Sequence, residues 1–330
     1  MKQFLQKKAK LVFLCMLVLL TCTACANPRG RDGKTLADQI IASEETTIDA
    51  SKINYKDISD KKLKKEIKKN IKDGQYTIQP TTFKNSMSKG WFEGLIVWPI
   101  AQIINLISSK TDAGVGIILT TLLIQMLVFV FTRKSQMSTQ RMQEIQPEIQ
   151  KIQNKYKDKT DERSKMQMAQ EMQNIYQKYD IHPFGSMLIT FIQLPIMMGM
   201  YYATMRSVSV VSGSFMGISL AGTPLDGFKA FDIAYISIYV LMVILYIVSM
   251  KLPQWLKKWQ DKKDNVKVKK YAQEETNPMA NSMNMSMYFM TAMICIMYIS
   301  WPMAMSFYWL VSSVIRVCQS LILHQVMNKK

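Results

Sequence analysis

The sequence is poor in the residues from which catalytic and metal sites are built. Its 330 residues include only two histidines and five cysteines. His182 and His324 stand far apart, Cys295 and Cys318 lie in apolar stretches, and no Walker-type glycine loop, Ser-His-Asp or Cys-His pattern occurs. We therefore predict that the chain is not an enzyme, holds no metal ion or disulfide framework, and binds no cofactor.

Acidic residues are also few. The chain has 24 Asp and Glu against 42 Lys and Arg, which gives a formal net charge of +18. Hydrophobic residues make up 48% of it and gather in runs long enough to cross a bilayer, which takes roughly 20 helical residues. The composition predicts an integral membrane protein with polar appendages rather than two soluble domains.

The amino terminus has the three parts of a secretory signal. A basic stretch ends at Lys10, an apolar core follows over residues 11–20, and small residues lead to Cys25. We predict that residues 1–24 are a signal peptide and that Cys25 carries the lipid, such as palmitate, of a lipoprotein. The residues before Cys25 resemble a bacterial lipobox, but Cys22 stands where that motif usually has leucine. Ordinary cleavage without lipid attachment and an uncleaved membrane anchor therefore stay open.

Polar and apolar blocks alternate along the rest of the chain. Residues 25–90 are polar and lysine-rich, and we expect an extracytoplasmic segment with one charged helix and little to bury. An apolar stretch interrupted by Pro99 predicts an amphipathic helix in the outer membrane interface. The predicted segments after residue 90 are this interfacial helix (91–111), a first transmembrane helix (112–132), a helical hairpin (133–184) and four further transmembrane helices (185–330).

The hairpin is predicted from two sets of apolar residues that recur every three or four positions. One set lies within residues 142–156 and the other within 166–179, on either side of the charged turn KDKTDE. Two amphipathic helices with so short a link form an antiparallel pair. Asp161 or Thr160 can cap the second helix.

The charges of the links predict the orientation of the chain. The four later spans are expected at about 185–205, 231–250, 286–301 and 303–324, and a lysine-rich loop over 251–285 joins the second and third of them. The positive-inside rule places this loop and the hairpin in the cytoplasm. We therefore expect a multi-pass protein of the bacterial plasma membrane, with its N-terminus outside and its C-terminus in the cytoplasm.

Polar side chains form stripes along the predicted spans. Small and hydroxylated residues let membrane helices approach one another, so packing explains much of this pattern. Packing does not explain Arg316. A charge inside a span faces a water-filled cavity or a partner, unless its long side chain reaches the headgroups. The candidate site residues are Thr121 and Gln125 in the first span, Gln193 in the second, and Trp309, Ser312 and Arg316 in the last.

Three motifs resemble the YidC/Oxa/Alb family of membrane protein insertases. They are RMQEIQPEIQKIQNKYKDK, YDIHPFGSMLITFIQLPI and SFYWLVSS, in this order. The resemblance covers about residues 91–325 and is to the five-span lipoprotein form of Gram-positive bacteria. It implies an all-α membrane protein with five transmembrane helices around a hydrophilic groove, a cytoplasmic helical hairpin and an outer amphipathic helix.

The resemblance also implies a function and partners. The family inserts and folds membrane proteins without nucleotide hydrolysis, through a groove open to the cytoplasm and the lipid. The implied partners are nascent membrane proteins, the Sec translocon and membrane lipids, with ribosome contacts through the hairpin and the basic loop. A small-molecule transporter or channel, and a structural partner of the translocon, are the alternatives from other classes.

One position departs from the family pattern. These insertases usually carry an arginine in the first span, and here that position falls on Gln125. Arg316 stands on the last span, where the family typically has a small or neutral residue. We predict that Arg316 supplies the positive charge of the groove and that Gln125 forms hydrogen bonds within the same cavity.

Overall fold

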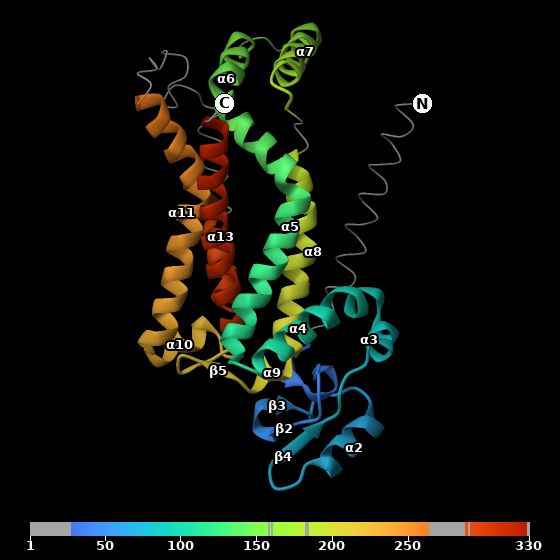
Figure 1. Ribbon diagram of the computed structural model, residues 1–330. Helices are drawn as coiled ribbons and strands as arrows, with labels where there is room; N and C mark the ends of the chain where they lie inside the picture. Colours follow the sequence, from blue (N-terminus) through green and yellow to red (C-terminus); the bar gives the residue numbers. More distant parts are fainter. Residues whose placement is uncertain are drawn as a thin grey trace. The chain divides into compact units, whose positions relative to one another are not determined.

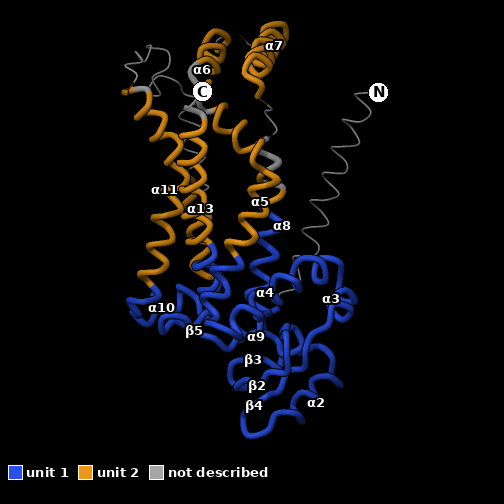
Figure 2. Tube along the Cα trace, viewed as in Figure 1, with its two compact units in different colours: residues 1–120, 193–235, 302–308 blue, residues 121–192, 236–301, 309–330 orange. Residues whose placement is uncertain are grey.

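The computed structural model describes residues 28–157, 159, 161–181, 185–263, 288–289 and 291–328. The predicted signal peptide, Cys25 and residues 264–285 of the lysine-rich loop lie outside this part of the chain (Figure 1). The chain divides into two compact units, coloured separately in Figure 2. Unit 1 comprises residues 1–120, 193–235 and 302–308, and unit 2 comprises residues 121–192, 236–301 and 309–330.

Unit 1 begins with a small α/β domain over residues 28–82, called here the N-terminal domain. Strand β1 (Thr35–Leu36) pairs in parallel with β3 (Ile53–Asn54), and β2 (Thr46–Asp49) pairs antiparallel with β4 (Gln75–Ile78). The 3-10 turns η1 (Ala37–Gln39) and η2 (Ala50–Lys52) and helix α2 (Lys61–Asn70) complete it. The expected charged helix thus forms and ends at Asn70.

The expectation that this segment has little to bury is wrong. Isoleucines and alanines far apart in its sequence meet in one core, which the polar composition of the surrounding residues hides. Helix α9 (Val208–Ser212) adds two valines to that core. The buried members are Ala37, Ile40, Ala42, Ile48, Ile53, Ile58, Ile67, Ile78, Val208 and Val211.

Backbone hydrogen bonds fasten this domain to the end of helix α8 (Gly185–Arg206) and to the residues that follow it. The amide of Ile41 donates to the carbonyl of Arg206 over 2.7 Å, and the amide of Val208 donates to the carbonyl of Ile41 over 3.0 Å. The Asn105 amide nitrogen donates to the Ile41 carbonyl over 2.8 Å, and its oxygen accepts from the Ser207 hydroxyl over 2.6 Å. Three segments distant in sequence are therefore joined at one buried asparagine.

The segment predicted as an interfacial helix (91–111) is helical through Pro99. Helix α3 (Phe83–Lys89) is followed by a π-helical segment η3 (Glu93–Val97) and by α4 (Trp98–Ser108). Pro99 stands in the first turn of α4, directly after the π segment, where a missing N–H is tolerated. The π segment also carries Glu93, whose carboxylate forms a largely buried ion pair with Arg206.

The rest of unit 1 contains the short elements between α8 (Gly185–Arg206) and the next long helix. Strands β5 (Ser214–Phe215) and β6 (Ile218–Ser219) form an antiparallel hairpin. Helix α10 (Pro224–Ala230) begins with a capping box, in which Thr223 and Asp226 each bond the other's backbone amide. These contacts give a fixed structure to residues 213–230, which are part of the link between α8 and the next long helix.

Three helices in the described chain are long and apolar enough to cross a membrane. They lie within α5 (Ala113–Glu144), α11 (Ile233–Lys263) and α13 (Met303–Asn328). Both α5 and α11 continue well past the predicted ends of their spans, by a dozen residues or more. The mostly helical fold of a membrane protein is therefore confirmed, while the number of spans stays a prediction.

Two amphipathic helices form where the sequence predicts a hairpin. They are α6 (Gln146–Lys155) and α7 (Glu162–Lys178), and the Asp161 carboxylate caps α7 by accepting from the Ser164 amide over 2.8 Å. Tyr179 near the end of α7 donates to Glu148 near the start of α6, so the two helices run antiparallel. Ile145, Ile149 and Ile181 form the buried centre between them.

Candidate functional site

Within its apolar stretch, helix α5 buries polar side chains and exposes several large apolar ones. Thr121, Gln125 and Thr132 are 0%, 8% and 0% exposed, whereas Met126 and Phe131 are 64% and 71% exposed. A water-soluble protein has the opposite arrangement, because burial of apolar surface drives its folding. In a bilayer the exposed apolar face lies against lipid, and the polar face is covered by protein.

The side chain of Gln125 is bonded across unit 2 to helix α13. Its amide nitrogen donates to the Ser312 hydroxyl over 3.1 Å, and Ser312 is fully buried. An unpaired amide in an apolar surrounding is costly, and this hydrogen bond lowers that cost. The glutamine in the first span is therefore one half of a buried polar pair.

Arg316 lies beside this pair. It stands one turn beyond Ser312 in α13, and its Nε donates to the Ser312 carbonyl over 3.4 Å. The guanidinium also lies 5.5 Å from the ring of Trp309 and 5.8 Å from the ring of Tyr246. These faces attract a cation, so two aromatic rings and a carbonyl hold the charge of Arg316 within unit 2.

Trp309 packs within an aromatic cluster. Its ring stacks on Tyr298 at 4.9 Å and 28°, and Tyr246 meets it edge-on at 6.2 Å. Trp309 is buried, and its ring packs against the guanidinium of Arg316. Tyr246 and Tyr298 lie in other predicted spans, where spacing alone does not distinguish a functional residue from one that only packs.

The structure brings together four of the six predicted site residues directly. Gln125, Ser312, Arg316 and Trp309 lie in one cluster of unit 2, and buried Thr121 precedes Gln125 by one turn. Gln193 belongs to unit 1, where its amide donates to the Tyr308 hydroxyl over 3.0 Å. Tyr308, which is fully buried, was not singled out from the sequence, because an aromatic residue in an apolar run gives no distinct signal.

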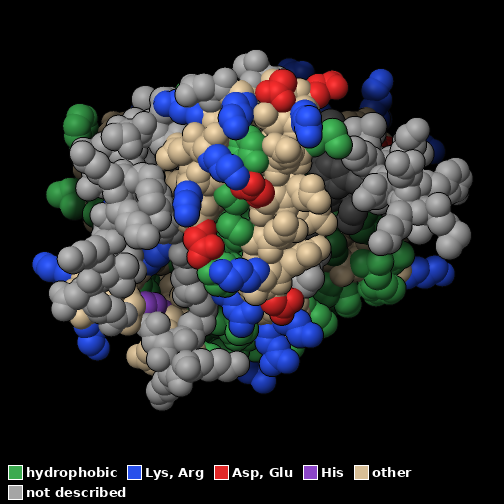
Figure 3. Space-filling view, turned by 90° about the horizontal axis from the view of Figure 1, so that it is seen from above, with side chains coloured by type: hydrophobic (Ala, Val, Ile, Leu, Met, Phe, Trp, Pro, Cys, Tyr) green, Lys and Arg blue, Asp and Glu red, His purple; other side chains and the backbone are tan. Residues whose placement is uncertain are grey.

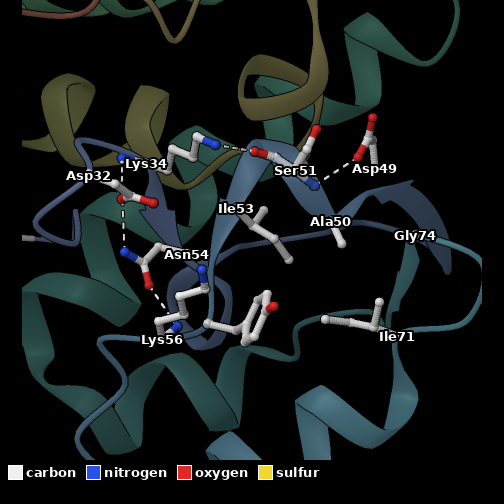
Figure 4. Close-up of a pocket in the computed structure, with 11 residues that line it drawn as sticks. Asp32, Lys34, Asp49, Ala50, Ser51, Ile53, Asn54, Lys56, Ile71 and Gly74 are labelled. Atoms are coloured by element: carbon white, nitrogen blue, oxygen red, sulfur yellow. Dashed lines mark hydrogen bonds between the residues drawn. The ribbon is translucent and has the colours of Figure 1, made fainter.

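A pocket of about 360 Å³ lies in the N-terminal domain (Figure 4). Its carboxylates are used to fix loops: Asp32 accepts from the Lys34 amide and from Asn54, and Asp49 accepts from the Ser51 amide over 2.7 Å. The hydrogen bond from the backbone of Ser51 holds the pKa of Asp49 below its ordinary value. None of the predicted site residues lines this pocket.

The hairpin carries charges of both signs. Lys155 and Tyr156 both bond the Glu171 carboxylate, at 2.5 Å and 2.9 Å. The hydrogen bond from Lys155, followed by that from Tyr156, lowers the pKa of Glu171. Viewed from the α6 and α7 end of the molecule, Lys and Arg side chains alternate with Asp and Glu side chains (Figure 3).

Among the described residues, no group of three or more His, Cys, Asp or Glu side chains is arranged to hold a metal ion. The polar cluster of unit 2 instead contains an amide, a hydroxyl and a guanidinium, which form hydrogen bonds and attract anions. It can therefore hold polar or acidic groups without covalent chemistry.

Comparison with known proteins gives the family. A model of the 60Kd inner membrane protein family matches residues 105–330. The chain is 30% identical over 237 residues to membrane protein insertase YidC 1 of Streptococcus pyogenes serotype M6, covering 72% of this chain and 75% of that protein. It is 27% identical over 238 residues to membrane protein insertase MisCA of Bacillus subtilis, covering 72% of this chain and 80% of MisCA.

A Listeria monocytogenes relative named membrane protein insertase YidC 1 is 29% identical over 257 residues, which are 77% of this chain and 78% of that protein. The matched family region contains the helical hairpin, α13 and the cluster around Gln125. The N-terminal domain, by contrast, precedes that region. This chain is an integral membrane protein that belongs to the YidC/Oxa/Alb family.

Proposed function

We propose that this protein inserts and folds membrane proteins, and that clients meet the cluster around Gln125, Ser312 and Arg316. The observation that carries the proposal is the buried hydrogen bond between Gln125 and Ser312, inside a helix pair whose other faces expose apolar side chains. The names of the relatives from Streptococcus, Bacillus and Listeria support it. Clients would enter through a groove open to the cytoplasm and to lipid.

Such a groove lowers the barrier that a polar client segment meets in hydrocarbon. A polar segment loses its hydration on entering the membrane, and Gln125 and Ser312 can exchange their mutual hydrogen bond for bonds to that segment. The apolar part of the client moves directly into lipid. No step in this sequence requires nucleotide hydrolysis, because burial of the client's apolar surface supplies the free energy.

Arg316 gives the cluster a preference for acidic segments. Its guanidinium is charged at every physiological pH and bonds carboxylates with two parallel N–H donors. Its neighbours in unit 2 include a carbonyl and two aromatic rings, and an incoming carboxylate offers it a stronger contact than these. In our proposal Arg316 thus replaces the arginine that the family carries at the position of Gln125.

The topology and the partners belong to the same proposal. We infer that the N-terminal domain lies outside the cell, anchored by lipid at Cys25, and that the hairpin and the C-terminus lie in the cytoplasm. The Sec translocon would act beside the protein. The ribosome would meet the hairpin and the basic loop.

Reconstitution tests the proposal against the alternatives. Proteoliposomes containing the purified protein should raise the yield of a protease-protected client with an acidic, translocated tail. They should pass no small solute, whereas a transporter or channel would pass solute and protect no client. Equal client protection with and without the protein would contradict insertase activity.

A further inference from the structure

Helix α2 of the N-terminal domain presents a predominantly positive surface. Residues 61–72 contain seven lysines and a single acidic residue, Glu66. The helix attaches to its domain through buried Ile67 and half-buried Leu63 on the opposite side. The exposed lysines are Lys61, Lys62, Lys65, Lys68, Lys69 and Lys72.

The rest of the domain does not share this charge. Residues 28–60 and 73–82 together contain five Lys and Arg but eight Asp and Glu. In the described chain, no ion pair joins a lysine of α2 to a carboxylate. The positive charge is therefore gathered on one face of a domain that is otherwise net acidic.

The arrangement opposes the helix that carries it. Lys61 and Lys65, and Lys65 and Lys69, are pairs of like charge four residues apart, and such pairs destabilise a helix. Helix formation is aided by the Asp60 cap, which accepts from the amides of Lys62 and Leu63. A bound polyanion would neutralise these lysines and remove the repulsion between them. A solvated helix surface that carries charges of both signs has no such repulsion to relieve.

The position of α2 points to a partner other than the bilayer. Trp91 and Leu95, four residues apart in the helical segment that contains η3, are both exposed, as expected for a helix face lying in the membrane interface. Within unit 1, α2 lies at the end of the N-terminal domain that is away from α8 (Figure 1). Because the lysines of α2 are exposed and the helix lies at that end, we infer that they meet water rather than lipid headgroups.

We propose that the lysine face of α2 binds a phosphodiester polymer in the aqueous space outside the membrane. Lys61, Lys65 and Lys68 follow one line along the helix, so successive phosphates of an extended chain meet successive ammonium groups. Binding would release counterions and depend strongly on salt. The proposal rests on the outward orientation of the N-terminal domain proposed above, and it lies outside the matched family region.

The test uses the full-length protein in nanodiscs of zwitterionic lipid, with fluorescent poly(glycerol phosphate) as the probe. The variant Lys61→Gln/Lys65→Gln/Lys68→Gln/Lys69→Gln keeps Leu63 and Ile67, and glutamine is a good helix former. We expect it to weaken binding about tenfold or more at low salt, with a shallower salt dependence. The corresponding four Lys→Arg changes should keep the affinity.

The matched control removes four exposed lysines from the hairpin: Lys157, Lys159, Lys165 and Lys178. Equal weakening by both sets of Gln changes would show attraction to net charge alone and would overturn the proposal. Preferential binding to phosphatidylglycerol vesicles over the polymer would overturn it in favour of a lipid partner.

An experiment with protoplasts tests the outward orientation of the N-terminal domain separately from polymer binding by the lysine face. Externally added polymer should bind wild-type protoplasts more than those carrying the α2 variant. A difference seen in nanodiscs but absent in protoplasts would contradict the outward orientation. The insertase proposal stands apart from this result, because client protection is measured without the polymer.

Discussion

The N-terminal domain and unit 2 follow opposite rules of burial. The domain encloses isoleucines and leaves its lysines exposed, whereas α5 and α13 enclose an amide and a hydroxyl and leave large apolar side chains exposed. The difference shows that one chain is adapted to two solvents. Water drives apolar groups together in the domain, and lipid requires polar groups to find one another in the spans.

The largest effect should come from the charge in the polar interior of unit 2. Arg316→Ser should reduce client protection to near background, because the attraction for acidic segments is lost. Adding Gln125→Arg should restore insertion, since Gln125 and Arg316 both bond Ser312. Proteoliposome assays with an acidic and a neutral tail check both expectations. Insertion at the wild-type level by Arg316→Ser would refute the proposal that Arg316 replaces the family's arginine. It would favour a structural role for the protein.

Removal of apolar volume distinguishes the two regions more directly. Ile67→Ala in the domain core should cost about 2–4 kcal/mol, because it leaves a cavity. Leu127→Ala on α5, where the side chain is 62% exposed, should cost about 0.5 kcal/mol or less. Native-state proteolysis of the full chain in nanodiscs gives both values. Similar costs at both positions would mean that Leu127 faces protein, not lipid.

Loss of a hydrogen-bonded polar pair should destabilise unit 2 more than the N-terminal domain, which is the reverse of the apolar case, and the effect should be smaller. Gln125→Leu should destabilise unit 2 by about 1–3 kcal/mol, because it breaks a buried hydrogen bond, and adding Ser312→Ala should recover part of the loss. Thr47→Val in the domain breaks an exposed hydroxyl pair with Thr77 and should cost much less. Thermal unfolding in detergent is the measurement. Additive losses for the Gln125 and Ser312 changes would argue against their coupling.

The smallest effect is expected in the solvent-exposed hairpin. The pKa of Glu171 is lowered chiefly by its hydrogen bond from Lys155, so its contribution to stability is present at neutral pH. That contribution is lost as the pH falls through the lowered pKa. Hydrogen exchange of α6 and α7 at pH 7 and pH 3 should show this loss in wild type. A Glu171→Gln variant with the same pH dependence would exclude Glu171 as its source.

The hairpin was predictable because its information is local. Apolar spacing of three and four gives the faces of α6 and α7, and Asp161 caps the second helix. The N-terminal core was missed because its strands are short and its isoleucines are scattered among lysines. The π segment before Pro99 was not predicted, because a π-helix has no simple sequence pattern.

The sequence by itself determined the membrane class, the amphipathic hairpin and the polar character of position 125, since composition and periodicity act over a few turns of chain. Only the tertiary structure decided which groups meet. Gln125 and Ser312 are 187 residues apart, and Asn105 is 64 residues from the carbonyl of Ile41 that it bonds. Such contacts depend on how distant helices pack, and a pattern within one helix records only which face is polar, not which partner covers it.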